Sequence, residues 1–155
     1  MKRIYLLSIV TMALVLCCPV TTSCASCTDG SFTTNTNPAK LPQAAQAVLN
    51  KHFAGKEILL IKQDYEWTRR YYDVIFVDGS KIEFDSNGQW TEIDCLQGAV
   101  PDALVPQQIL TFVKKKIPNC LITQIDRDRR GYDVDLSNGL EIEFNKNFQV
   151  IDIDD

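Results

Sequence analysis

Carboxylates are the side chains whose types and spacing in this sequence could support shared chemistry. They recur in two series sixty positions apart, Asp73, Glu83 and Glu92 and then Asp133, Glu143 and Asp152. Carboxylates held close together bind cations and basic partners, and a pair with different pKa values performs acid–base catalysis. Which of these uses applies depends on the elements that hold them.

Motifs typical of enzymes are missing from the sequence. The single histidine, His52, stands beside Lys51 without a cysteine or carboxylate at ligand spacing, which is typical of a helix-surface residue. There is no Gly-x-Ser-x-Gly nucleophile motif, no glycine-rich phosphate loop and no paired-cysteine metal site in the folded part. The segment 85–88 resembles the start of a calcium loop but lacks the downstream glutamate, so it favours a hairpin turn. We therefore expect neither catalysis nor a cofactor.

An internal repeat places the carboxylates. Residues 72–94 and 132–154 align without a gap, and the shared pairs include Tyr72/Tyr132, Asp73/Asp133, Val74/Val134, Gly79/Gly139, Ile82/Ile142, Glu83/Glu143, Phe84/Phe144, Ile93/Ile153 and Asp94/Asp154. Upstream, residues 42–53 match residues 106–117 at an offset of 64. Such self-similarity indicates one structural unit given twice.

Each copy predicts one helix followed by four strands. Leu41-Pro42 and Val105-Pro106 open the helices, apolar residues recur with helical spacing, and Gly55 and Pro118 end them. Strands are expected at 57–63, 71–77, 80–85 and 90–94, and at 121–127, 132–137, 140–145 and 149–154. The predicted fold class is α+β, with two tandem repeats (41–95 and 106–155) joined by a linker (96–105). Each repeat is one helix packed on a four-stranded antiparallel sheet.

Strand register follows from keeping charge out of the core. A three-residue loop with a left-handed Gly79 pairs Val74 with Ile82, and a two-residue Asn87-Gly88 turn then pairs Phe84 with Thr91. In copy two Phe148 replaces Gly88, so Asn147 is expected to take the strained turn position. The predicted core residues are Tyr72, Val74, Phe84, Ile93, Tyr132, Val134, Phe144 and Ile153.

The same registers predict an acidic face opposite the helices. Its rows are Asp73–Glu83–Glu92 and Tyr71–Asp85–Trp90 in copy one, and Asp133–Glu143–Asp152 and Asp135–Glu141–Asp154 in copy two. Like charges opposite each other on a sheet cost roughly a few tenths of a kcal/mol per pair, which favours a compensating cation or basic partner. The alternative is internal pairing with the basic residues of neighbouring segments, namely Lys62, Arg69, Arg70, Arg127, Arg129 and Arg130.

Residues 1–24 have the composition of a secretory signal peptide, with Lys2-Arg3, an apolar run to Leu16 and then small polar residues. The run is shorter than the roughly 20 residues that span a bilayer. Residues 25–40 are predicted to be a flexible tether, and a lipid anchor on Cys17, Cys24 or Cys27 stays an alternative. We expect an exported protein of the periplasm or envelope, whose membrane contact is limited to such an anchor.

Removal of Lys2 and Arg3 with this peptide takes the net charge from −4 to −6, which disfavours nucleic-acid binding. Two of the six cysteines, Cys95 and Cys120, lie in the folded part. An oxidising compartment permits a bridge between them. If the intervening helix is a parallel crossover, however, they lie beyond the roughly 7 Å limit for a disulfide. A bridge and two separate thiols both stay open.

The motifs resemble a known family. A helix opened by Leu-Pro, then Tyr-x-Val, Asp/Asn-Gly, Ile-Glu-Phe and Ile-Asp, given twice over Leu41–Asp154, is similar to the PepSY-like, beta-lactamase-inhibitor-like family of exported Bacteroidetes proteins. The resemblance implies a doubled helix-on-sheet fold, like that of the beta-lactamase inhibitory protein, whose open sheet face grips a partner enzyme. It also implies kinship with inhibitory propeptide modules of secreted peptidases. It supplies no catalytic residue.

Two functions follow as hypotheses. The first is a non-catalytic binding module, an inhibitor or regulator of an envelope enzyme such as a peptidase, whose protein partner contacts Trp67, Tyr71, Asp73, Glu83, Trp90 and Glu92. The second is a cation (calcium)-responsive structural domain of the envelope. Its carboxylates would be Asp133, Glu143, Asp152, Asp135, Glu141 and Asp154.

Overall fold

The computed structural model describes residues 36–66 and 69–155. Its first half holds α1 (Gln43–His52) and strands β1 (Ile58–Glu66), β2 (Arg69–Phe76), β3 (Lys81–Asp85) and β4 (Trp90–Asp94). Its second half holds α2 (Gln107–Lys116) and strands β5 (Ile122–Arg127), β6 (Gly131–Leu136), β7 (Glu141–Asn145) and β8 (Val150–Asp154). This order is consistent with two repeats. No helix within the described residues is long and apolar enough to cross a membrane.

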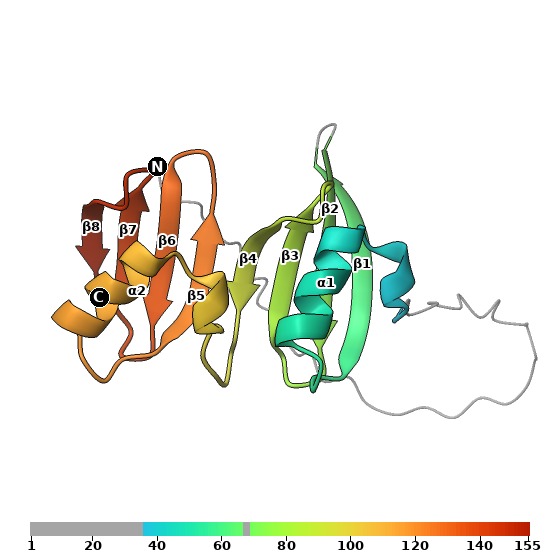
Figure 1. Cartoon of the computed structure of the whole chain (residues 1–155), viewed down its shortest axis with the longest axis horizontal. Coiled ribbons are helices and arrows are strands. Elements are labelled where there is room, and N and C mark those ends of the chain that lie inside the picture. The colour runs from blue at the N-terminus through green and yellow to red at the C-terminus, as the bar shows by residue number, and fades with distance from the viewer. Residues whose placement is uncertain (1–35, 67–68) are drawn as a thin grey trace, which may run out of the picture. The chain divides into compact units, whose positions relative to one another are not determined.

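All eight strands form one antiparallel sheet in chain order (Figure 1). The predicted α+β class is confirmed. The sheet continues through both halves because β4 pairs with β5, with Ile93 opposite Ile125. The segment that contains α2 therefore joins antiparallel neighbours, and the parallel crossover considered for Cys95 and Cys120 is wrong. The Cys95 amide donates to the Thr123 carbonyl at 2.8 Å, and both cysteines are free thiols.

The two helices cover one face of the sheet, with α1 against the strands of the first half and α2 against those of the second (Figure 1). The rings of Phe112 on α2 and Phe144 on β7 pack edge to face, 5.4 Å apart at their centroids. Of the predicted core, six residues are buried: Tyr72, Val74, Phe84, Ile93, Val134 and Phe144. Tyr132 is only partly buried. The prediction for Ile153 is wrong, since it is 48% exposed on the last strand of the sheet.

The first hairpin of each half has the predicted register. Val74 lies opposite Ile82, and the left-handed turn glycines Gly79 and Gly139 have φ angles of 86° and 90°. In the second half the strained turn residue is Phe148 (φ 60°) rather than Asn147, so that prediction is wrong. The Phe148 ring stacks on Tyr132 at 5.5 Å between centroids, and this contact offsets part of the strain.

The second hairpin of the first half differs from the prediction. Its loop is one residue longer than expected, because the Asp85 amide donates to the Gln89 carbonyl. Phe84 therefore lies opposite Trp90 and not Thr91, and a bulge at Thr91 restores the expected pairing of Glu83 with Glu92. The extra loop residue and the bulge together leave the remaining register as predicted.

Two segments predicted to be irregular contain short helices. Within the predicted tether, η1 (Pro38–Lys40) forms a 3₁₀ turn that is capped by the Asn37 side chain. Within the predicted linker, η2 (Asp102–Leu104) follows the buried Val100. The predicted signal peptide, its candidate lipidation sites and most of the tether lie outside the described residues.

Gly88 should be the turn residue least tolerant of a side chain. It has a φ of 78°, and a Cβ there would lie 2.8 Å from both the Ala45 amide nitrogen and the Pro42 Cβ of the α1 start. Gly139 has a similar φ of 90° but open space around it. We expect Gly139→Ala to cost about 1 kcal/mol of unfolding free energy through backbone strain alone. Gly88→Ala should cost about 2–4 kcal/mol because α1 must also shift.

Urea denaturation of the two variants measures this difference. Equal losses in the two variants would show that α1 does not press on the Gly88 turn.

Candidate functional site

One carboxylate from each of seven consecutive strands lies in a single line on the face opposite the helices. The strand registers set this carboxylate row side by side as Asp73, Glu83, Glu92, Asp126, Asp133, Glu143 and Asp152. Lys62 on β1 lies opposite Asp73 and ends the row. The predicted alignments Asp73–Glu83–Glu92 and Asp133–Glu143–Asp152 are therefore confirmed. They are parts of one longer row.

Asp126 is the member that sequence reasoning missed. It lies on β5 between Glu92 of β4 and Asp133 of β6, and it joins the two predicted rows. The repeat gave no signal for it, because the matching residue of the first half is Lys62. Only the pairing of β4 with β5 brings Asp126 between two other carboxylates.

A second line runs beside the carboxylate row on the same face. It contains Ile75, Lys81, Asp94, Gln124, Asp135, Glu141 and Asp154. This arrangement includes the other predicted acidic row of the second half. The single lysine of the line belongs to the first half.

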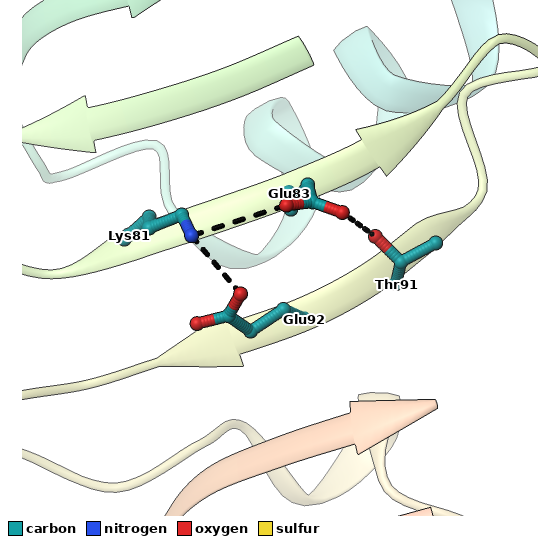
Figure 2. A network of polar contacts seen from close by, with 4 residues as sticks. All are labelled: Lys81, Glu83, Thr91 and Glu92. Atoms are coloured by element: carbon teal, nitrogen blue, oxygen red, sulfur yellow. Dashed lines mark hydrogen bonds and ion pairs between the residues drawn. The ribbon is translucent and has the colours of Figure 1, made fainter. Parts of the chain in front are cut away.

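Lys81 compensates the first half of the carboxylate row (Figure 2). Its Nζ lies 3.0 Å from Glu92 Oε2 and 3.9 Å from Glu83 Oε2. The Thr91 hydroxyl donates to Glu83 Oε1 at 2.8 Å. Burial raises the pKa of the Glu83 carboxyl, while this hydrogen bond and the Lys81 charge oppose the rise. Glu83 and Glu92 of the first half are therefore held in an ionic network with Lys81 and Thr91.

In the part of the chain that the structure describes, the second half of the row has no such ion pair. Among the described residues, no lysine or arginine lies within 4.0 Å of the carboxylates of Asp126, Asp133, Glu143 and Asp152. Arg130, which was a candidate for internal pairing, donates instead to Asp128 at 3.1 Å. Burial and the Glu143 charge raise the pKa of Asp133, and Arg130 opposes this only from a distance.

The alternative of internal pairing also fails for Arg127. Its guanidinium lies on the helix face, 4.4 Å from the centroid of the Trp90 ring, and donates to the Trp90 carbonyl. The predicted outward position of Trp90 is wrong. Because the longer turn places Trp90 opposite Phe84, its side chain joins the core and is 8% exposed.

The other predicted contact residues stay on the outer face. Tyr71 lies opposite Asp85, as predicted, and Asp73, Glu83 and Glu92 form the first part of the carboxylate row. Trp67 lies outside the described residues. The predicted aromatic row is thus interrupted, and charge dominates the face.

Asp126 has the most perturbed acidity on this face. Burial, together with repulsion from Glu92 and Asp133, raises the pKa of Asp126 to about 7. A neighbouring cation would lower this pKa again, because an opposite charge favours the ionised carboxylate. The ionisation of Asp126 near neutral pH therefore depends on whether a cation or a basic side chain lies against the outer face.

The arrangement of the rows differs from that of a metal centre. Within the described residues, no group of three or more Asp, Glu, His or Cys side chains is placed to hold a metal ion. The predicted calcium ligands therefore do not form such a group either; they are Asp133, Glu143, Asp152, Asp135, Glu141 and Asp154. Neighbouring strands lie about 4.8 Å apart, so carboxylates on them extend side by side, whereas calcium ligands converge to about 2.4 Å from one ion.

Comparison with known proteins identifies similar chains. Residues 70–152 match the family described as "Putative beta-lactamase-inhibitor-like, PepSY-like". A crystal structure of a "putative periplasmic protein" from Bacteroides vulgatus is 41% identical, covers 81% of this chain and 100% of its own, and superposes with a TM-score of 0.76. No curated protein matches the sequence.

Two further solved structures are similar over most of the chain. A "putative calcium-regulated periplasmic protein" from Bacteroides thetaiotaomicron is 37% identical, covers 77% of this chain and 94% of its own, and has a TM-score of 0.74. A second B. vulgatus protein, of unknown function, is 34% identical, covers 79% of this chain and 98% of its own, and has the same TM-score.

Replacement of Asp126 should change how stability depends on pH. Its pKa is about 7 in the folded state against an ordinary value of 3.8. Between these values the folded chain holds a proton that the unfolded chain has lost. The contribution of Asp126 to stability therefore declines as pH rises from about 4 to about 7, and the penalty is complete above 7. Asn carries no charge at any pH, so Asp126→Asn should lack this decline.

Urea denaturation between about pH 4 and pH 8.5 tests this expectation. The difference in unfolding free energy between Asp126→Asn and the wild type should shift in favour of the variant by about 1–2 kcal/mol from the low to the high end of this range, after allowance for solvent screening. The control is Asp128→Asn, which should be less stable than the wild type by a nearly constant amount above about pH 5, because backbone hydrogen bonds and Arg130 lower the pKa of Asp128 and its carboxylate is ionised throughout that range. Parallel pH profiles for wild type and Asp126→Asn would contradict the assignment.

Proposed function

This chain belongs to the PepSY-like, beta-lactamase-inhibitor-like family, and from that membership we propose that it is a non-catalytic, exported binding module. Its carboxylate row is the surface that takes a basic protein partner. The relatives from B. vulgatus and B. thetaiotaomicron are described as periplasmic, which supports the same location for this chain.

The observation that carries the proposal is the second half of the carboxylate row, whose acids form no ion pair with a lysine or arginine of the described residues. Like charges opposite each other on a sheet destabilise the chain that holds them. Lysine and arginine side chains of a partner would replace this repulsion with attraction. Complementary charge also steers a partner towards the face and increases the rate of association. Charge repulsion that destabilises the isolated chain would thus favour formation of the complex.

The proposed partner is an enzyme of the envelope, which the module inhibits or regulates. The family description, which refers to a beta-lactamase inhibitor, supports this role. In the first half Tyr71, Asp73, Glu83 and Glu92 add contacts on the same face, and Trp67 remains a proposed contact beside them. Trp90 contributes to stability instead, because it is packed in the core.

Neutralising the second half of the row should abolish capture of the partner. The test variant carries Asp126→Asn, Asp133→Asn and Glu143→Gln, which are all on the outer face. The matched control carries Glu57→Gln, Asp102→Asn and Asp155→Asn, and it loses the same charge at exposed positions away from the row. Immobilised wild type and control should capture the same basic protein from envelope extract, more strongly at low salt. The test variant should not.

The captured protein is then identified and assayed with and without the purified module. A fall or rise of its enzymatic rate supports the regulatory role. Equal capture by all three proteins would place the binding surface elsewhere.

A calcium-responsive domain is the second candidate function. The name of the B. thetaiotaomicron relative, at 37% identity, favours it, and the two acidic lines of the second half supply oxygen ligands of the right kind. The absence of a converging ligand group among the described residues counts against it. Calcium would have to draw neighbouring carboxylates together on binding.

Thermal denaturation tests this candidate. Calcium at about 10 mM should raise the melting temperature, because a ligand selective for the folded state stabilises it by mass action. Glu143→Gln combined with Asp152→Asn should remove the shift, and magnesium at equal concentration controls for ionic strength. If the wild type shows no shift beyond that of magnesium, the candidate is discarded.

A further inference from the structure

The sheet ends in two strands that have a partner on one side only. Within the described residues β1 pairs with β2 alone, and β8 pairs with β7 alone. All five residues of β8 are exposed. Such edge strands present unpaired backbone N–H and C=O groups that another strand can bind.

The chain itself contains a paired version of the β8 edge. Ile93 of β4 lies opposite Ile82 as Ile153 of β8 lies opposite Ile142, so β4 and β8 hold equivalent places in the two halves. On its other side β4 continues to β5, where Ile125 lies opposite Ile93. Ile93 is fully buried, whereas Ile153 is 48% exposed. The missing neighbour of β8 is therefore a strand that resembles β5.

The equivalent of β5 is β1, the other edge strand. Ile61 of β1 lies opposite Val74 as Ile125 of β5 lies opposite Val134. The side of β1 that faces away from β2 thus matches the side of β5 that pairs with β4. One molecule carries both surfaces of its internal joint, and they stand at opposite ends of its sheet.

We propose that copies of this chain associate head to tail, with β8 of one copy pairing antiparallel with β1 of the next in the register of the β4–β5 joint. Ile153 of one copy then lies opposite Ile61 of the next. On the outer face Asp152 lies opposite Lys62. The proposal uses the edges of the sheet and does not require partner binding on its outer face, where Asp152 is the last member of the carboxylate row.

Charge favours this pairing over the pairing of β8 with β8. In the internal joint Glu92 lies opposite Asp126, which is an unfavourable pair of like charges. The proposed joint replaces it with an acid and a base, both exposed in the single chain. Pairing β8 with β8 would bring Asp152 and Asp154 of one copy close to the same acids of the other. A second copy that presents its β1 is therefore the occupant that fits.

The contact should be weak and should propagate. The internal joint has only three opposed residue pairs, so a copy-to-copy joint of this size is small against the roughly 1,200–2,000 Å² of a stable interface. Because the two surfaces differ, the association is heterologous, and it either closes into a ring or continues as a chain of molecules. Association should therefore depend steeply on concentration.

The association is tested by sedimentation velocity of the purified protein from about 10 µM to about 1 mM. This concentration range detects weak contacts with dissociation constants from about 10 µM to about 1 mM. The wild type should shift progressively to species larger than one chain. Lys62→Glu and Asp152→Lys should each reduce the association constant by about tenfold or more, since each places like charges across the joint. An equimolar mixture of these two variants should regain association, because each chain then supplies the opposite charge at both edges. Lys116→Glu, an equal charge change on the exposed end of α2, should associate as the wild type does.

Three results would overturn the proposal. The first is a single chain at about 1 mM. The second is that Lys62→Glu and Asp152→Lys both associate as strongly as the wild type. The third is an effect of Asp152→Lys without any effect of Lys62→Glu, which would show that β8 pairs with β8. Circular dichroism of each variant confirms that a loss of association is not a loss of fold.

Discussion

The pairing of β4 with β5 is the contact on which the rest of the structure depends. Through Ile93 and Ile125 it joins two helix-covered halves into one sheet with a shared apolar face. The same pairing places Glu92 beside Asp126 on the outer face, so a continuous core and a continuous acidic row are consequences of a single strand contact. Arg127 stacks on Trp90 at this joint, on the helix face, where an arginine cannot neutralise the row.

The magnitudes explain why the row is tolerated. Burial of a large apolar side chain such as Phe84, Ile93 or Phe144 contributes about 1.5–3 kcal/mol. A pair of like charges across two strands costs roughly 0.2–1 kcal/mol. The apolar residues therefore decide the register, and the carboxylates occupy whatever positions that register gives them. Selection for binding can place acids on the outer face without endangering the fold.

The hydrophobic pattern determined which face of each strand is buried, and hence most of the register, because Gly79 and Gly139 fix the first hairpins. It could not locate Trp90, since a two-residue turn and a three-residue turn followed by a bulge give the same pairing of Ile82 with Ile93. It could not predict that Ile153 is exposed either. Alternation within β8 shows which face a residue takes, whereas burial requires a neighbouring strand. The strand order that places Asp126 in the row is likewise a tertiary feature.

The two halves differ in charge more than in fold. The second half has acids at three outer positions, Asp126, Asp135 and Glu141, where the first half has Lys62, Ile75 and Lys81. Lys81 forms ion pairs with Glu83 and Glu92, so the first half compensates two of its own acids. The second half has a similar apolar core without that compensation, and its pairs of like charges cost stability. Its excess negative charge does not help to hold the chain together, and we propose that it serves the binding of a basic protein or a cation on the outer face.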